Sequence, residues 1–279
     1  MERRQFLKRC YQLGGYAAIA QLGMGAVEDA IGHGIMPALM GGSEASTTTV
    51  AWSAWDELNE ATLATDNIFV ALMENTSAGG NEVGQGGNLA EVNRTLTQAG
   101  NIAGATGSPL TRQFDTNKWM TLTNTLAQFV CSSTYTIIMK WNTANDAEGT
   151  FFRIVEAFND TIFIIQHASR ILSVTTDASG TDAVTDAFAA TGNVYIVFQA
   201  DGGVHNGMLA WNTTKPTSFG SIAAGQKKDI GTSGNISGET AGGGGTQMLG
   251  SSLPSNQVAY QVTAKLQYII LSNTALLTY

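Results

Sequence analysis

The stretch NVYIVFQADGGVHNGMLAW, residues 193–211, decides the fold class. Its first part, Asn193 to Ala200, is rich in Val, Ile and aromatic residues, which is typical of a β-strand. Asp201, Gly202 and Gly203 follow as turn residues. Because Gly207 to Trp211 then resumes an apolar run, we expect the two runs to pair as an antiparallel hairpin.

A second stretch, TYTIIMKW at residues 134–141, alternates so that Tyr135, Ile137, Met139 and Trp141 share one face. This pattern predicts a strand with that face in the core, Trp141 included. Further short strands are expected over residues 67–73, near 91–98, at 129–130 and over 151–158, 161–166, 171–175 and 260–271. Asn159 and Asp160 are expected to form the turn between 151–158 and 161–166.

The fold class follows from this series of short strands and turns. Roughly a dozen strands separated by turn residues favour an all-β protein with two antiparallel sheets packed as a sandwich or jelly roll. The one helix we expect is short and N-terminal, over residues 54–63, with Ser53 as its N-cap. A glycine loop is expected over residues 238–245.

Composition narrows the possible partners. Charged residues are only 13% of the 279-residue chain, and the net charge is −8. This balance argues against nucleic-acid binding, which needs clustered Lys and Arg to neutralise phosphates. It also argues against a basic face that binds anionic lipid. Few charges together with 32 glycines and 4 prolines are typical of an extracellular or virion-type β protein.

Two further classes are excluded by the cysteines and by the lengths of the apolar runs. Cys10 and Cys131 are too few for a disulfide framework or a cysteine-rich metal site. Cys131 has no flanking basic residue, so we expect a small buried side chain. No apolar run beyond residue 45 is long enough to span a membrane.

The chain begins MERRQFLK, which resembles a twin-arginine export signal because Arg3 and Arg4 precede Phe6, Leu7 and Lys8. A weakly apolar stretch, residues 11–27, follows, and Ser43 and Ala45 form an A-x-A-like cleavage site, with Ala18 and Ala20 as an earlier alternative. The resemblance implies export of the folded protein to the periplasm or the extracellular space.

The same N-terminal segment admits a second interpretation. Glu28 and Asp29 interrupt its apolar region, and residues 35–40 form another apolar stretch. The segment could therefore be an amphipathic arm that stays in the working protein. In both cases we expect residues 1–45 to be a signal peptide or an arm, and residues 46–279 to be one sandwich domain.

The order of segments from Leu110 to Tyr279 resembles a laminin-G-like, concanavalin A-like jelly roll. The segments that carry the resemblance are TRQFDTNKWMTL (111–122), YTIIMKWNT (135–143), the hairpin 192–211 with its Asn206-Gly207 turn, and the final segment with Asn273, Ala275 and Leu276. The resemblance implies the sandwich fold without an invariant chemical signature. Thr263, Ala264 and Lys265 stand where the family often has Gly and Asp, so no calcium site is implied there.

Catalytic motifs are missing from the sequence. A glycoside hydrolase needs two closely placed carboxylates, and the best strands contain only Glu156, with Asp160 after it. The three histidines, His33, His167 and His205, share no metal-ligand spacing, and no G-x-S-x-G motif occurs. We therefore expect a protein that is not an enzyme. A hydrolase stays open only because active sites assemble from distant residues.

Sugar binding needs aromatic platforms beside polar donors and acceptors. Trp119 and Trp211 lie at strand edges near asparagines, so we expect Trp119, Trp211, Asn206 and Asn212 to form the ligand-binding residues. Trp52 and Trp55 are weaker candidates.

Calcium is the one ion that the turns could hold, because it binds carboxylate, amide and carbonyl oxygens. Asp201 and Asn206 bracket the central hairpin turn and are the expected ligands, with Asn159 and Asp160 as a second pair. No other cofactor is expected.

Two functions remain. The first is a secreted, non-catalytic recognition module that binds glycan or another surface polymer through loops at one edge of the sandwich. The alternative is a structural subunit of a virion or an extracellular filament, assembled as a homo-oligomer or larger array through the jelly roll and the N-terminal arm.

Overall fold

The computed structural model describes residues 67–279 with gaps at 144–147, 157–158, 177–180, 190, 204–206, 232–235, 237–240, 242–246 and 252–260. The signal or arm predicted for residues 1–45 and the helix predicted for 54–63 lie outside the described residues, as does all but one residue of the glycine loop. Trp52, Trp55 and the candidate ligand Asn206 also lie outside them.

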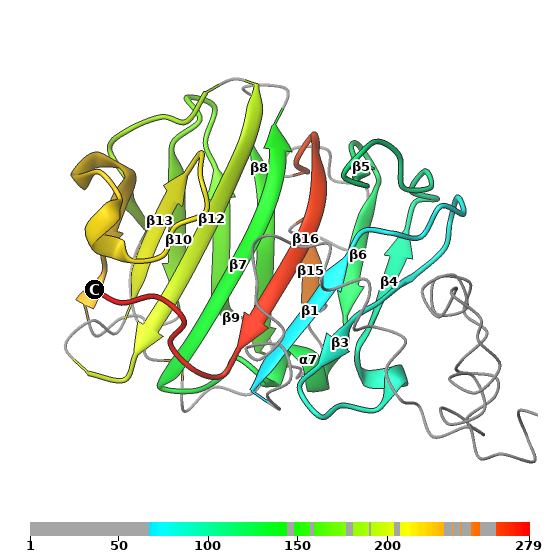
Figure 1. Cartoon of the computed structure of the whole chain (residues 1–279), viewed down its shortest axis with the longest axis horizontal. Coiled ribbons are helices and arrows are strands. Elements are labelled where there is room, and N and C mark those ends of the chain that lie inside the picture. The colour runs from blue at the N-terminus through cyan, green and yellow to red at the C-terminus, as the bar shows by residue number, and fades with distance from the viewer. Residues whose placement is uncertain are drawn as a thin grey trace, which may run out of the picture. The chain divides into compact units, whose positions relative to one another are not determined.

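Two antiparallel eight-stranded sheets form a sandwich, which confirms the predicted fold class (Figure 1). In the first sheet the order is β14 (Lys227–Asp229), β13 (Met208–Asn212), β12 (Gly192–Asp201), β7 (Thr134–Thr143), β16 (Ala264–Ser272), β1 (Ile68–Leu72) and β3 (Gln85–Gly86), and β5 (Arg112–Phe114) pairs with β16. In the second it is β11 (Thr181–Ala183), β10 (Leu172–Thr176), β9 (Asn159–Gln166), β8 (Gly149–Glu156), β15 (Gln247–Leu249), β6 (Trp119–Leu122), β4 (Thr95–Ala99) and β2 (Glu82–Val83).

The central strands follow the predicted alternation. Tyr135, Ile137, Met139 and Trp141 of β7 all lie in the buried core between the sheets. The predicted hairpin is confirmed, because β12 and β13 pair antiparallel with Tyr195 opposite Asn212. The second sheet contributes its own inward side chains to the same core, among them Met120, Leu122, Phe151, Phe152, Ile154, Ile162, Ile164, Leu172 and Val174.

Two local predictions were wrong. Residues 129–130 do not form a strand: they follow a short helix, α7 (Asn124–Gln128), whose N-cap Thr123 accepts a hydrogen bond from the Leu126 N–H. Asn159 and Asp160 do not form the turn between β8 and β9, because they pair with Glu156 and Val155 in the ladder. The strand predicted near residues 91–98 is confirmed by β4, which follows the 3₁₀ turn η1 (Glu91–Asn93), and β2 and β3 precede it.

The segment 111–122, expected as one opening strand, divides between the two sheets. Its first part, β5, pairs with β16 in the first sheet, and its second part, β6, pairs with β15 and β4 in the second. The 3₁₀ turns η2 (Phe219–Ser221) and η3 (Ala224–Gln226) lie between β13 and β14. In the described part of the chain, no helix is long and apolar enough to cross a membrane.

The C-terminal tail crosses the ends of β12 and β7 after β16 (Figure 1). The side-chain Oε1 of buried Gln199 accepts hydrogen bonds from the N–H groups of Leu276 and Leu277, both at 2.9 Å. Its Nε2 donates to the Leu277 carbonyl at 2.7 Å. The Tyr279 ring packs 4.9 Å from that of Phe219. One amide side chain therefore fixes the tail against the first sheet.

Candidate functional site

A recess opens at the end of the sandwich where β7 ends and β12 begins, at the top of the view in Figure 1. Its volume is about 290 Å³, at the lower end of the range for small-molecule pockets. The stretch that leads from β11 in one sheet to β12 in the other supplies part of its wall. The lining residues are Thr143, Phe188, Ala189, Thr191, Gly192, Asn193, Val194 and Thr213.

Pairing between β7 and β12 sets the positions of the residues on one side of this pocket. Gly192 lies opposite Thr143, and Asn193 lies opposite Asn142. The Asn142 Nδ2 group donates to the Asn193 Oδ1 at 3.2 Å, which orients the second amide. Gly192 has a φ of +129°, a conformation that side chains rarely allow, and an added Cβ would find no atom within 4 Å. The pocket is therefore open beside Gly192.

Phe188 borders the pocket and is held by both sheets. Its ring lies 5.8 Å from Trp211 of β13 and 6.4 Å from Phe151 of β8. Its carbonyl accepts a hydrogen bond from the Arg170 Nε at 2.8 Å. Because only 1% of its surface is exposed, Phe188 helps to fix the position of the pocket residues and presents no aromatic platform to a ligand.

Thr143 is the most enclosed polar residue of the lining, with 2% of its surface exposed. Its Oγ1 has no hydrogen-bond partner among the described residues. A buried hydroxyl without a partner lowers stability by roughly 1–3 kcal/mol. Such a group in a pocket wall marks a place where a polar atom of a ligand could be accommodated after a small shift.

A second hollow lies over α7 and is much more open. It is lined by Asn124, Thr125, Gln128, Phe129 and Ala241. Gln128 already accepts a hydrogen bond from the Ala241 N–H at 2.8 Å. Because this hollow is shallow and its central amide is bonded, the recess at Thr143 is the better candidate site.

The predicted aromatic platform is only partly supported. The expectation that Trp211 is exposed was wrong: it is 5% exposed, and its Nε1 donates to the Asp186 carbonyl at 3.0 Å. The Trp211 ring is buried because it lies on the inward face of β13 and packs on Phe188. Trp119 is partly exposed, but it lies on β6 in the other sheet (Figure 1), so the two tryptophans do not form one platform.

Asn212 lies next to the pocket residue Thr213. Its Oδ1 accepts the Thr213 N–H at 2.8 Å, so this predicted ligand residue shapes the chain beside the pocket.

Tyrosines also lie on the first sheet: the Lys140 Nζ is 5.0 Å from the Tyr195 ring and 5.9 Å from that of Tyr268. Both rings are buried, at 6% and 1% exposure, and present no platform.

The calcium prediction remains untested. Asp201 is in place at the hairpin, where its Oδ1 accepts the Gly203 N–H at 2.8 Å, as a turn aspartate does. Its expected partner Asn206 lies outside the described residues. Asn159 and Asp160 lie in the β8–β9 ladder and do not form the predicted turn. Among the described residues, no group of three or more His, Cys, Asp or Glu side chains could hold a metal ion.

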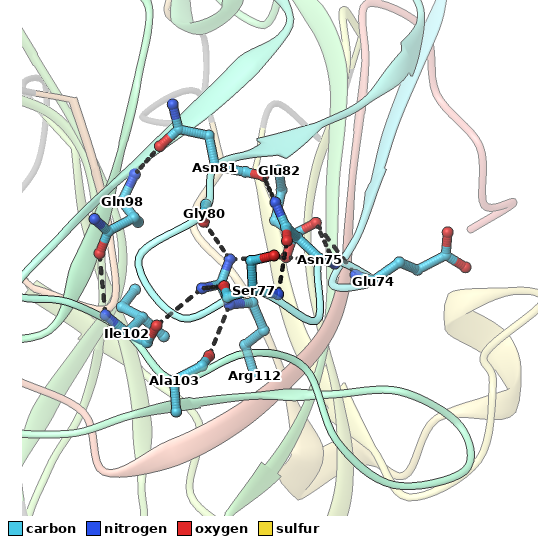
Figure 2. Close-up of polar contacts among 10 residues, drawn as sticks. All are labelled: Glu74, Asn75, Ser77, Gly80, Asn81, Glu82, Gln98, Ile102, Ala103 and Arg112. Atoms are coloured by element: carbon cyan, nitrogen blue, oxygen red, sulfur yellow. Dashed lines mark hydrogen bonds and ion pairs between the residues drawn. The ribbon is translucent and has the colours of Figure 1, made fainter.

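Sequence reasoning missed a buried cation, Arg112, whose side chain is fully enclosed (Figure 2). Its Nη1 lies 3.0 Å from the Glu82 Oε1 and also donates to the Gly80 carbonyl. Its Nη2 donates to the Ile102 carbonyl at 3.0 Å, and its Nε to the Ala103 carbonyl at 3.1 Å. Arg112 thus joins β2 and two loop segments, one at Gly80 and one at Ile102 and Ala103, to β5.

Glu82 is the anion of this cluster, and its side chain is 4% exposed. Besides Arg112, it accepts the Asn75 N–H at 3.1 Å and the Glu74 N–H at 3.2 Å. Burial raises the pKa of Glu82, and the bonds from Asn75 and Arg112 oppose that rise. The Glu74 side chain points away from it in Figure 2. A carboxylate so enclosed and bonded has no access to substrate, so this cluster is structural.

A serine and a histidine also meet, after β9. The His167 Nε2 lies 2.6 Å from the Ser173 Oγ. This resembles half of a nucleophilic dyad, but Ser173 is 0% exposed, so its hydroxyl cannot attack a substrate. Cys131 is a small buried side chain, as predicted.

The pocket and the Arg112 cluster were missed for a shared reason. The pocket takes its lining from β7, the 188–191 stretch, β12 and the start of the turn after β13. Glu82 and Arg112 are 30 positions apart. The only local signal was that Arg112 shares a strand face with Phe114, an unusual place for a charge in a chain with so few.

No protein-family model and no curated protein matches this chain. Solved structures of similar fold include a mutant of Trypanosoma rangeli sialidase that displays trans-sialidase activity (TM-score 0.49, 13% identity, covering 75% of this chain and 31% of that chain). Another is Trypanosoma rangeli sialidase (TM-score 0.47, 14% identity, covering 77% and 32%). A third is the Ruminococcus gnavus IT-sialidase CBM40 bound to α2,3-sialyllactose (TM-score 0.41, 14% identity, covering 55% and 82%). The chain spans about a third of the length of the two Trypanosoma chains. At these TM-scores and identities, the similarity is no evidence for the function of this chain.

Proposed function

We propose that this protein is a non-catalytic recognition module that binds a glycan of a surface polymer in the recess between β7, β12 and Phe188. The observation that carries the proposal is one small recess whose exposed rim brings together the hydroxyl groups of Thr191 and Thr213 and the amide of Asn193. Sugars present many hydroxyl groups, and hydroxyl and amide side chains bond to them as donors and acceptors.

The non-catalytic part of the proposal is supported by the state of the acids and nucleophiles. The Glu82 carboxylate is buried and bonded to Arg112 and to two backbone N–H groups. The Ser173 hydroxyl is also buried. The described residues that line the recess carry no titratable group. General acid–base hydrolysis needs two carboxyl groups about 5–10 Å apart around the sugar.

The test compares two alanines of one exposed stretch. Ala189 lines the pocket and is exposed, and Ala187, two residues earlier, is exposed but does not line it. We expect the Ala189→Leu side chain to fill the opening and abolish binding on a glycan array and in calorimetry. Ala187→Leu, the matched control, should bind as the unaltered protein does. Sialyllactose belongs among the probes, together with neutral oligosaccharides.

The proposal fails if the unaltered protein binds no glycan on the array. It also fails if Ala189→Leu binds every glycan as well as Ala187→Leu does, because the binding would then lie elsewhere. Both variants change exposed positions, so neither should unfold the protein.

Export is the second part of the proposed function. The Arg3-Arg4 motif supports a folded protein delivered to the periplasm or the extracellular space. The intact mass and N-terminal sequence of the protein from its native location test this. A chain that begins near Ser46 is expected, and a chain that begins at Met1 or Glu2 would contradict export with cleavage. The virion or filament role remains a prediction from composition.

A further inference from the structure

A row of polar side chains leads from the recess along the outer face of the first sheet, the face turned away from the second sheet. Asn193 of β12 lies opposite Asn142 of β7, and Asn142 lies opposite Lys265 of β16, on three neighbouring strands (Figure 1). Asn193 and Lys265 are exposed, and Asn142 is partly exposed. Because Asn193 also lines the recess, this row begins at the candidate site.

The alternation of the strands turns the three side chains of the row towards solvent. Successive side chains of a strand point to opposite faces of the sheet. The residues next to those of the row belong to the buried core cluster, namely Trp141, Val194, Ala264 and Leu266. The Asn142 Nδ2 donates to the Asn193 Oδ1 at 3.2 Å, which shows that these two amides share one face. A ligand outside the sheet can therefore reach all three.

Gly192 leaves room for a ligand to pass from the recess to the row. It lines the recess directly before Asn193, and an added Cβ there would find no atom within 4 Å. Neighbouring strands lie about 4.8 Å apart, so Lys265 stands roughly 10 Å from Asn193 along the row. This length suits a chain of sugars, because a single sugar in the recess does not reach Lys265.

Lys265 gives the far end of the row a positive charge. The residues opposite it on both neighbouring strands, Asn142 and Gln113, are uncharged. Asp115, two residues after Gln113, is already held by the Lys118 Nζ at 2.8 Å. An ammonium group donates up to three hydrogen bonds, and those to an anionic oxygen are stronger than those to a neutral one.

We infer, on the basis of the proposed function, that the protein recognises an acidic glycan chain. One sugar occupies the recess, the amides of Asn193 and Asn142 bond to hydroxyl groups of the next, and Lys265 bonds to a carboxylate or sulfate further along. Because the protein carries −8 overall, long-range attraction does not favour an anionic polymer. The preference therefore rests on the local contact with Lys265.

Oligosaccharide pairs that differ only in an anionic group test this preference. Sialyllactose and oligogalacturonate are each compared with their methyl esters, and sulfated with unsulfated chondroitin oligosaccharides. We expect the more acidic member of at least one pair to bind about three-fold more tightly in calorimetry, the gain of one surface ion pair. The pair that shows the gain identifies the anion as a carboxylate or a sulfate. Equal affinity within every pair would overturn the inference.

Lys265→Gln locates the charge. It should remove the gain and leave the affinity for the less acidic member unchanged. Lys228→Gln is the matched control, because Lys228 is an exposed lysine of β14 at the edge of the same sheet. The control removes the same charge from the protein and should keep the gain. A gain that survives Lys265→Gln, or that both variants lose, would contradict a contact at Lys265.

Asn193→Ala tests the course of the glycan along the row. It should weaken binding of both members of a pair alike, by about two- to ten-fold for one hydrogen bond. Unchanged affinity for both members would place the glycan elsewhere and overturn the inference. If glycans bind and respond to Ala189→Leu, but no preference depends on Lys265, only this inference fails. If no glycan binds at all, the proposed function fails with it.

Discussion

At the scale of single residues, the buried Glu82–Arg112 pair does the most to hold the loops before β6. The two charges are enclosed, so their attraction is weakly screened, but each also lost its hydration on folding. The buried pair is tolerated because backbone groups satisfy the other hydrogen-bonding positions of both side chains. Three backbone carbonyls lie within hydrogen-bond distance of Arg112, and two backbone N–H groups lie within that distance of Glu82. Removing one partner leaves the other buried and unpaired.

We expect Arg112→Met to lower the free energy of unfolding by about 3–5 kcal/mol, because it leaves the Glu82 carboxylate uncompensated. Urea denaturation measures the change. Lys118 provides the control, since its Nζ lies 2.8 Å from the Asp115 Oδ2 in a partly exposed pair. Lys118→Met should cost about 0–1 kcal/mol. Equal losses in the two variants would contradict a structural role for the buried pair.

For Thr143 we predict the opposite effect on the free energy of unfolding. Because its hydroxyl is buried and has no partner among the described residues, Thr143→Val removes an unsatisfied group at nearly constant volume. The variant should be as stable as the unaltered protein or more so, by up to about 1–2 kcal/mol. Thermal unfolding measures this, and a destabilisation of the variant would show that the hydroxyl has a partner in the folded protein.

Tyr279 makes the protein sensitive to high pH. Burial raises its pKa to about 12, and its OH donates to the Gln199 carbonyl. In the unfolded chain a tyrosine ionises near pH 10. The folded state therefore holds the proton more tightly between pH 10 and 12, and the stability it contributes is lost as pH rises through that range.

Comparison with Tyr279→Phe isolates this effect. The difference in unfolding free energy between the unaltered protein and the variant should be constant below pH 10 and shrink steadily above it. Burial also raises the pKa of Tyr135 in both proteins, and Tyr279 adds to that rise, so the difference reports Tyr279 together with its effect on Tyr135. A difference that stays constant to pH 11.5 would refute the assignment to Tyr279.

At the scale of elements, the C-terminal tail depends on one strand residue. Gln199 lies on β12, yet its amide makes three hydrogen bonds to Leu276 and Leu277. Gln199→Leu should lower the free energy of unfolding by about 1–3 kcal/mol, since it leaves the Leu277 N–H without its acceptor, while the Leu276 N–H keeps the Thr136 Oγ1 at 3.1 Å. Hydrogen exchange at Leu276 and Leu277 should speed up more than at the central strand β7. Equal acceleration of exchange in the tail and in β7 would indicate that the variant destabilises the whole domain and that Gln199 does not hold the tail specifically.

The elements that could be predicted from the sequence were those with strong local patterns. The alternation in β7 and the apolar runs of β12 and β13 are properties of neighbouring residues, and all three strands formed as expected. The helix α7 was missed because a five-residue helix shows no periodicity, and its Thr123 cap resembles any turn threonine. Asn159 and Asp160 were assigned to a turn by preference alone, while the pairing with β8 placed them in a strand.

The candidate site was less predictable than the strands. Asn212 was one position from the pocket residue Thr213, but the prediction relied on an exposed Trp211, and tertiary packing on Phe188 buried that ring. Exposure depends on which face of a strand meets the other sheet, and in the five-residue strand β13 the alternation was too brief to show this.

At the scale of the whole molecule, the first and last described strands close the fold together. β1 pairs with β16 over five residues, from Ile68 opposite Ser272 to Leu72 opposite Tyr268. Its inward residues Phe69 and Ala71 lie in the shared core. The sandwich is thus completed by residues just after position 66, and the domain boundary at residue 46 stays a prediction.

Two truncations of the chain test that boundary. Deletion of residues 1–45 should leave cooperative unfolding, the urea m-value and the free energy of unfolding unchanged, because no described strand is removed. Deletion of residues 1–73 removes β1 and exposes the edge of β16, so it should abolish the cooperative transition, since the m-value follows the surface buried on folding. If the shorter deletion also abolishes it, residues 1–45 are part of the working fold. That outcome would favour an N-terminal arm over an export signal. It would also favour the structural role in a virion or filament over the role as a secreted recognition module.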